Sequence, residues 1–349
     1  MRRSSDLILP LAAFLFAAPA WAQFQNVKPP DVPEIAVDSA PNFLKLPDGL
    51  YLGEPAGVAQ DSKGNIFVFA RSNETRLFEF DKEGNFLREI GRGLYAFAFA
   101  HTVRIDPKDN IWVIDEGTNM IVEFNPAGRV VTVMGRRPEA SEGVLASPLP
   151  GTPVPPAHPY YFNRPTDVAW DSDGNIFVSD GYGNSRVAKY DKNGRFIRDV
   201  GSKGDQAGQF NTPHSIAIDA KNNVYVADRG NWRIQVFDDD LTLRTIYGQG
   251  GTIGRNGAIC ITPGPHQYLY SSSSNETGTM DIGQIYKMEL DGTVLGKFGR
   301  AGKALKEYGA VHEVSCRNDN ELLVGELLNW RVQKLTLHPT PATPRTTGR

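Results

Sequence analysis

Three of the six histidines in this 349-residue chain stand at the same position of an internal repeat, each at the start of a strand-like segment. His101 opens HTVRIDPKDNIWVID, His214 opens HSIAIDAKNNVYVAD and His312 opens HEVSCRNDNELLVGE. Copies of one structural unit around a common axis can bring such side chains to one point. Three imidazoles around an open fourth position are the ligand set of a catalytic zinc site. We therefore predict a zinc ion bound by these three histidines.

Taken singly, each of these histidines could instead cap a turn or line a water-filled channel. Their shared position favours the metal site, because the inner strands of a symmetrical fold converge on one axis. The other histidines are His158, His266 and His338. They stand in loops or in the C-terminal tail, and we expect them to be solvated.

Self-similarity along the chain predicts the fold that positions these residues. Each copy of the repeat holds about four short segments of alternating apolar and polar residues, separated by turns rich in Asp, Asn and Gly. Five copies are marked by the equivalent residues Val58, Val103, Val168, Ile216 and Val314. A less regular copy runs from Gly257 to Gly302. Four strands per copy at this spacing predict an all-β protein, a six-bladed β-propeller over residues 46–337.

The ends of the chain are expected to lie outside the propeller. Basic residues, a short apolar run and a small-residue cleavage motif predict a signal peptide over residues 1–22. An N-terminal segment follows at 23–45, and residues 338–349 read as a disordered tail. The final copy is one strand short, and we expect residues 42–54 to supply that strand. The mature protein is expected to be secreted or periplasmic.

Composition narrows the classes of partner. The net charge is -3, from 37 basic and 40 acidic residues without a basic cluster, which argues against nucleic acid. No apolar run in the mature chain is long enough to span a membrane, and we expect a soluble monomer. The two cysteines, Cys260 and Cys316, are predicted to be unpaired thiols. A single bridge between neighbouring repeats is the alternative that an exported location permits.

A second set of residues is expected at the same mouth of the channel as the histidines. In an up-and-down blade, the start of the first strand and the end of the second share one face. Arg71 and Arg229 are each the third residue after an equivalent valine, and Tyr182 stands in the corresponding turn of another copy. They could be surface or packing residues, but the structural arginines of the repeat occupy a different position, at Arg186, Arg233 and Arg331. Two guanidiniums beside a metal suit a carboxylate, and a tyrosine there could act as a base.

These residues carry a family resemblance over about residues 50–337. The segments PTDVAWDSDGNIFVSDGYGNSRV, GQFNTPHSIAI and VADRGNWRIQVF resemble the NHL repeat and, more narrowly, the peptidyl-α-hydroxyglycine α-amidating lyases. The resemblance implies zinc at the three histidines and an active site with Tyr182, Arg71 and Arg229. It also implies a structural calcium ion, bound by the backbone carbonyls of Val58 and Val103 and by the carboxylate of Glu313. Glu313 is longer than the aspartate usual in that family.

The activity implied by the resemblance is cleavage of a peptidyl-α-hydroxyglycine into a peptide amide and glyoxylate. Tyr182 would remove the hydroxyl proton, Arg71 would grip the substrate carboxylate and Arg229 would hold Tyr182 as phenolate. The expected partner is a small molecule or peptide with a C-terminal carboxylate. A non-enzymatic binding or scaffold propeller and a zinc hydrolase of another small carboxylate are the alternatives. The Pro-rich insertion at 138–162 could be a lid or a partner surface.

Overall fold

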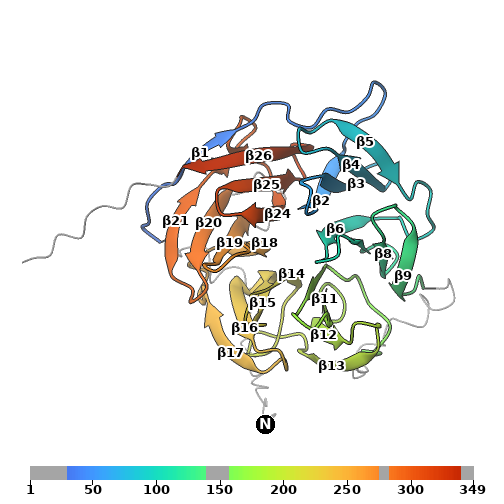
Figure 1. Ribbon diagram of the computed structural model, residues 1–349. Helices are drawn as coiled ribbons and strands as arrows, with labels where there is room; N and C mark the ends of the chain where they lie inside the picture. The colour runs from blue at the N-terminus through green and yellow to red at the C-terminus, as the bar shows by residue number, and fades with distance from the viewer. Residues whose placement is uncertain (1–29, 139–156, 275–282, 339–349) are drawn as a thin grey trace, which may run out of the picture.

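The computed structural model describes residues 30–138, 157–274 and 283–338. These residues form six four-stranded sheets that stand around a central axis like the blades of a propeller (Figure 1). The predicted all-β, six-bladed fold is confirmed. The expected signal peptide, most of the insertion at 138–162 and the tail after residue 338 lie outside the described residues. Within the described ranges, no helix combines the length and the apolar character needed to cross a membrane.

Five blades are built from four consecutive strands, with the first strand innermost (Figure 1). Blades one and two are β2 (Glu54–Gln60), β3 (Ile66–Arg71), β4 (Arg76–Phe80), β5 (Phe86–Ile90), β6 (Ala100–Ile105), β7 (Ile111–Asp115), β8 (Met120–Phe124) and β9 (Val130–Gly135). Blades three and four are β10 (Asp167–Trp170), β11 (Ile176–Asp180), β12 (Arg186–Tyr190), β13 (Phe196–Val200), β14 (Pro213–Ile218), β15 (Val224–Asp228), β16 (Arg233–Phe237) and β17 (Leu243–Tyr247). Blade five is β18 (Arg255–Ile261), β19 (Tyr268–Ser274), β20 (Gln284–Glu289) and β21 (Val294–Phe298).

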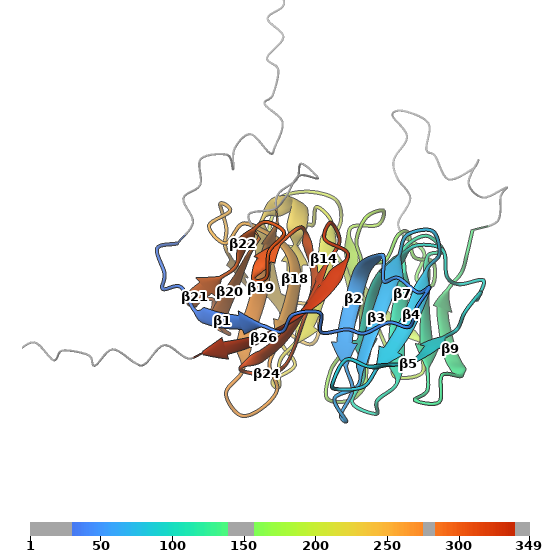
Figure 2. The same ribbon diagram turned by 90° about the horizontal axis from the view of Figure 1, so that it is seen from above.

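The sixth blade joins the two ends of the propeller. It contains β24 (Val311–Asn318), β25 (Glu321–Glu326) and β26 (Arg331–His338), and its outer strand is β1 (Ala36–Ser39). β1 runs antiparallel to β26, with Ala36 opposite His338 (Figure 2). The loops of the described residues also contain the 3-10 helix η2 (Arg229–Asn231) and the parallel pair β22 (Arg300–Ala301) and β23 (Glu307–Tyr308).

The strand that closes the ring differs from the predicted one, and two predicted domain boundaries change with it. We expected residues 42–54 to close the ring, but β1 lies before them, inside the segment at 23–45 that we had placed outside the propeller. The physical reason is local: Pro47 begins a turn in which its carbonyl accepts from the N–H of Leu50 at 3.1 Å, so this stretch cannot run as a strand. It serves instead as the link from blade six to blade one. His338 likewise belongs to β26 and not to the tail.

Aspartates of the repeat explain why the hairpins form where they do. Asp61 accepts the backbone N–H groups of Lys63 and Asn65 at 2.9 and 2.8 Å, which closes the turn between β2 and β3. The same arrangement recurs at Asp106, Asp171 and Asp219. These turns fix the register of the first two strands in four blades.

The arginines that we expected to be structural are structural. Arg186, Arg233 and Arg331 each donate through Nε to a buried acid at the end of the second strand, at 2.8 to 3.0 Å. The acids are Asp180, Asp228 and Glu326. Arginines at this position of the repeat therefore form structural ion pairs within their blades. Arg71 and Arg229 stand at a different position.

Apolar side chains of facing blades form the core between them. Phe69 and Leu77 of blade one pack with Val103 and Val122 of blade two, and all four are buried. Full burial of one such side chain contributes about 1.5–3 kcal/mol. The valines and isoleucines that mark the repeat belong to these clusters. They therefore face the neighbouring blades, and other positions of the inner strands face the channel.

Cys260 and Cys316 form a disulfide, with Cα atoms 6.1 Å apart. The prediction of unpaired thiols was wrong, and the alternative of a bridge between neighbouring repeats is correct. The bond joins β18 to β24, the inner strands of blades five and six. Sequence spacing could not show this pairing, because the cysteines meet only when blades five and six pack against each other.

Candidate metal centre and active site

The three histidines are placed by irregularities in the inner strands. In β6, Ala100 pairs with Asp115 and Thr102 pairs with Ile114, so the pairing skips His101. The pairing of β14 skips His214 in the same way, and that of β24 skips His312. Such β-bulges interrupt the alternation of side chains and re-aim one of them. Here the re-aimed side chain is the imidazole.

The imidazoles meet at the axis of the ring. Their ring centroids are 4.6 to 4.9 Å apart, and one nitrogen of each lies within 4.8 Å of the other two. They come from blades two, four and six, so that they approach the axis from alternate blades. All three are buried. We call His101, His214 and His312 the histidine layer.

The intervening blades orient these rings. At the same repeat position they carry Ala56, Thr166 and Gly257. His214 Nδ1 contacts the carbonyl of Gly257 at 2.6 Å, and His312 Nδ1 contacts that of Ala56 at 2.7 Å. The backbone of Thr166 faces His101 outside hydrogen-bonding geometry. A carbonyl on Nδ1 fixes the tautomer and leaves Nε2 free to bind a metal.

The protonation of the histidine layer also suits a metal. Burial is the main cause that lowers the pKa of His101 and of His214 well below the usual value, with further lowering by neighbouring cationic groups. Burial lowers the pKa of His312 to about 3. Neutral imidazole is the form that coordinates metals. Neither ring nitrogen of His101 has a hydrogen-bond partner, although both are buried. Such orphaned polar atoms are rare and call for a ligand.

Tyr182 stands at the edge of the histidine layer. Its hydroxyl lies 3.1 Å from Nε2 of His214, and its ring is 5.6 Å from that of His101. The turn that carries it holds one residue more than the η2 turn of blade four, and the extra residue is Gly181. A Cβ on Gly181 would lie 2.0 Å from the carbonyl oxygen of Pro213, so glycine alone fits there.

The two predicted arginines lie at the same mouth of the channel. The guanidinium of Arg229 lies over the ring of Tyr182, with Cζ 5.2 Å from the centroid, and its Nε is buried without a partner. Arg71 donates through Nε to Glu54 at 2.9 Å and through Nη1 to the carbonyl of Ala100 at 3.2 Å. These contacts fix the plane of Arg71 beside the strand that carries His101. The structure thus brings together the six residues predicted for the zinc site and the active site.

Two residues of this mouth were missed by the sequence analysis. Arg164 also lies over the ring of Tyr182, with Cζ 4.5 Å from the ring centroid. Its Nε donates to Oε1 of Glu116 at 2.8 Å, and the Glu116 side chain is 5% exposed. Glu116 is the third residue after Val113, which is the register that identified Arg71 and Arg229. That register could therefore have found Glu116, but no spacing pattern points to Arg164.

The residues assigned to calcium do not fit a calcium ion. The Glu313 carboxylate accepts from the hydroxyl of Thr102 and pairs with Nη1 of Arg104 at 3.1 Å. Burial raises the pKa of Glu313, and Arg104 opposes that effect. A guanidinium therefore stands beside the expected carboxylate ligand. The ion pair with Arg104 argues against calcium at Glu313, and the calcium site of Val58, Val103 and Glu313 stays a prediction.

Known proteins resemble the chain in sequence and in fold. The NHL repeat family matches residues 162–190 and 210–237. Peptidyl-glycine alpha-amidating monooxygenase of Mus musculus is 29% identical over 343 residues, which is 87% of this chain and 33% of that protein. A probable peptidyl-alpha-hydroxyglycine alpha-amidating lyase of Caenorhabditis elegans is 30% identical over 217 residues, 55% of this chain and 57% of that protein.

The chain thus spans about a third of the mouse protein and over half of the nematode one. The resemblance to NHL repeats and to amidating lyases is confirmed by these matches. Among solved structures, a virginiamycin B lyase of Staphylococcus aureus superposes with a TM-score of 0.55 at 12% identity, covering 87% of this chain and all of that one. At this identity the likeness concerns the fold alone.

Proposed function

We propose that the protein is an exported, zinc-dependent lyase that cleaves a peptidyl-α-hydroxyglycine into a peptide amide and glyoxylate. The names of the relatives support the lyase class. The observation that carries the proposal is the contact between the Tyr182 hydroxyl and the histidine layer, at 3.1 Å from His214 Nε2. A base at this position could accept the proton of a substrate hydroxyl held at the histidine layer.

The histidine layer would hold the zinc through one ring nitrogen of each histidine. Zinc bound there would supply Lewis-acid chemistry that stabilises the deprotonated α-hydroxyl of the substrate. Arg229 and Arg71 would bind the substrate carboxylate and fix its orientation. The buried, unpartnered Nε of Arg229 supports a share of that role for Arg229 as well as for Arg71.

The reaction needs one proton to move out and back. Tyr182 takes the proton of the α-hydroxyl, and the C–N bond breaks as the carbonyl of glyoxylate forms. The amide nitrogen leaves with the electron pair and takes a proton from Tyr182. Arg229 and Arg164, on the ring of Tyr182, would stabilise its anionic form through their charge. No water is consumed, which distinguishes this lyase from a hydrolase.

Metal analysis followed by an assay of glyoxylate release tests the proposal. The purified protein is expected to carry one zinc ion per chain after dialysis and to release glyoxylate from an α-hydroxyglycine compound. A protein that binds zinc and releases no glyoxylate would favour the scaffold or the hydrolase of another carboxylate. The hydrolase is then recognised by water-dependent cleavage of ester or lactone substrates.

A further inference from the structure

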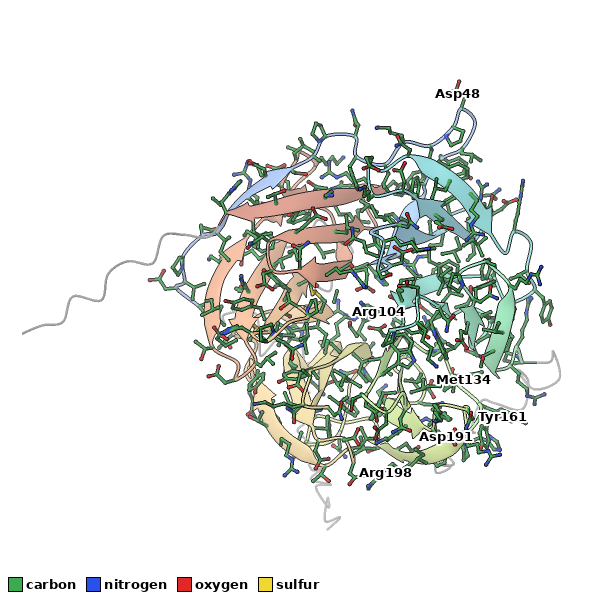
Figure 3. The ribbon with its side chains drawn as sticks, viewed as in Figure 1. Asp48, Arg104, Met134, Tyr161, Asp191 and Arg198 are labelled. Atoms are coloured by element: carbon green, nitrogen blue, oxygen red, sulfur yellow. A yellow bond between two sulfur atoms is a disulfide. The ribbon has the colours of Figure 1, made fainter. Side chains whose placement is uncertain are left out.

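An arginine that the lyase proposal does not use crosses the channel next to the histidine layer. Arg104 extends from β6, and its side chain is 14% exposed. Its Nε and Nη2 donate to the two carboxylate oxygens of Asp167 at 2.8 and 2.5 Å. Its Nη1 lies 3.1 Å from Oε1 of Glu313. Figure 3 shows Arg104 at the centre of the ring. One guanidinium from blade two thus joins carboxylates of blades three and six.

The carboxylate oxygens of Asp167 and Glu313 also accept hydrogen bonds from hydroxyl groups. Asp167 accepts the hydroxyl of Ser215 at 2.9 Å, and Glu313 accepts the hydroxyl of Thr102. The Ser215 hydroxyl in turn accepts the N–H of Ile259 at 3.2 Å. The network therefore ties the inner strands of five blades: β6, β10, β14, β18 and β24. We call Arg104, Asp167, Glu313, Thr102 and Ser215 the arginine layer.

The arginine layer closes the channel on one side. A cavity of about 480 Å³ opens at the mouth opposite the histidine layer, and Arg104, Ile216 and the disulfide partners Cys260 and Cys316 line it. Arg104 thus lies between this cavity and the histidine layer. A substrate can accordingly approach the histidine layer from the mouth that carries Tyr182.

We infer that the guanidinium of Arg104 takes the place of the calcium ion expected in the channel, so that the propeller is held by a cation of its own chain. Glu313, the expected carboxylate ligand, is already paired with this guanidinium. A divalent cation against the same carboxylate would be repelled by the guanidinium, most strongly in a buried site. Arginine does not lose its charge in proteins, so the internal cation is permanent.

The first test uses the full wild-type protein and reads metal content and thermal unfolding, neither of which depends on lyase activity. After dialysis against calcium-free buffer, it is expected to contain no stoichiometric calcium. Added calcium at millimolar concentration is expected to leave the melting temperature unchanged. One tightly bound calcium per chain, or a clear rise in melting temperature on adding calcium, would overturn the inference.

The second test removes the internal cation. Arg104→Ala leaves Asp167 and Glu313 buried without their partner, and a fall in melting temperature of about 10 °C is expected. Calcium is expected to restore part of that loss, because the two carboxylates then face a free site. Arg317→Ala is the matched control, since Arg317 is an exposed arginine that lines the same cavity outside the arginine layer. It should neither lower the melting temperature appreciably nor create a response to calcium.

Two further variants keep the inference testable if Arg104→Ala does not fold. Arg104→Lys keeps the charge but cannot form the fork with Asp167, so its melting temperature should fall without any response to calcium. Arg104→Met combined with Asp167→Asn and Glu313→Gln removes the charges together and should unfold at a higher temperature than Arg104→Ala. An Arg104→Lys variant that calcium stabilises would contradict the role assigned to the positive charge.

Discussion

Two layers of the same channel share the inner strands β6, β14 and β24 but differ in how far their polar side chains are hydrogen-bonded. In the arginine layer every side chain has polar partners from other inner strands. In the histidine layer, backbone carbonyls contact the rings of His214 and His312, while both nitrogens of His101 have no partner. A closed network of this kind stabilises a fold, and an unsatisfied cluster marks a place for a ligand.

The two layers are also coupled along the chain. Thr102, Ser215 and Glu313 of the arginine layer directly follow the three histidines. The network that ties the blades therefore also fixes the backbone on which the imidazoles are mounted. The arginine layer thus supplies the rigidity that the proposed metal site in the histidine layer would need.

The largest effect should follow from breaking the histidine layer. His214→Ala removes one of three ligands and should abolish stoichiometric zinc binding. Loss of the Lewis acid forfeits several kcal/mol of transition-state stabilisation, so glyoxylate release should fall about 10³-fold or more. The matched control is His266→Ala, whose side chain is 61% exposed. Full zinc content in the triple variant of His101, His214 and His312 would refute the site.

Tyr182→Phe sharpens the distinction between binding and catalysis within the histidine layer. It removes one oxygen and should leave the zinc content and the melting temperature unchanged. Loss of a positioned base costs about 10²–10⁴-fold in turnover. Steady-state kinetics of glyoxylate release measures it. Undiminished turnover would remove Tyr182 from the mechanism and leave the metal site standing.

The disulfide tests whether covalent closure matters to both layers. Replacing Cys260 and Cys316 with serine should lower the free energy of unfolding by about 2–4 kcal/mol, the usual contribution of such a bond. Zinc content should not change, because the histidines are held by hydrogen bonds and packing. Chemical denaturation and metal analysis of the same sample give both quantities. Loss of zinc from the folded variant would show that the disulfide positions the metal site.

Arg164→Ala should have the smallest effect. The guanidinium lies over the ring of Tyr182 at 4.5 Å and is 55% exposed. A cation–π contact of this kind contributes about 0.5–2 kcal/mol, so kcat/KM should fall by about 2- to 30-fold. Arg198→Ala, an exposed arginine on the outer strand β13, is the control. An unchanged kcat/KM would mean that Arg164 merely neutralises Glu116.

Much of this site could be predicted from register alone. The repeat places His101, His214 and His312 at one level, and the third position after the strand valines gave Arg71 and Arg229. Repetition makes such predictions possible, because equivalent positions of a propeller converge on one axis.

The parts that sequence could not give depend on contacts between different blades. Arg104 meets Glu313 across 209 positions of the chain only after the ring has closed. The disulfide likewise joins two different blades, five and six. Arg164 meets Tyr182 within blade three, but no position of the repeat marks it. The closing strand was misplaced because four residues with weak alternation, at Ala36–Ser39, carry little signal of their own.

The central claim is that the histidine layer holds a zinc ion that the reaction requires. The direct measurement is glyoxylate release from an α-hydroxyglycine compound by protein stripped of metal, with metal added back in steps. The account predicts no activity in the metal-free protein, full recovery at one equivalent of zinc and none with calcium. Undiminished glyoxylate release by the metal-free protein would contradict it.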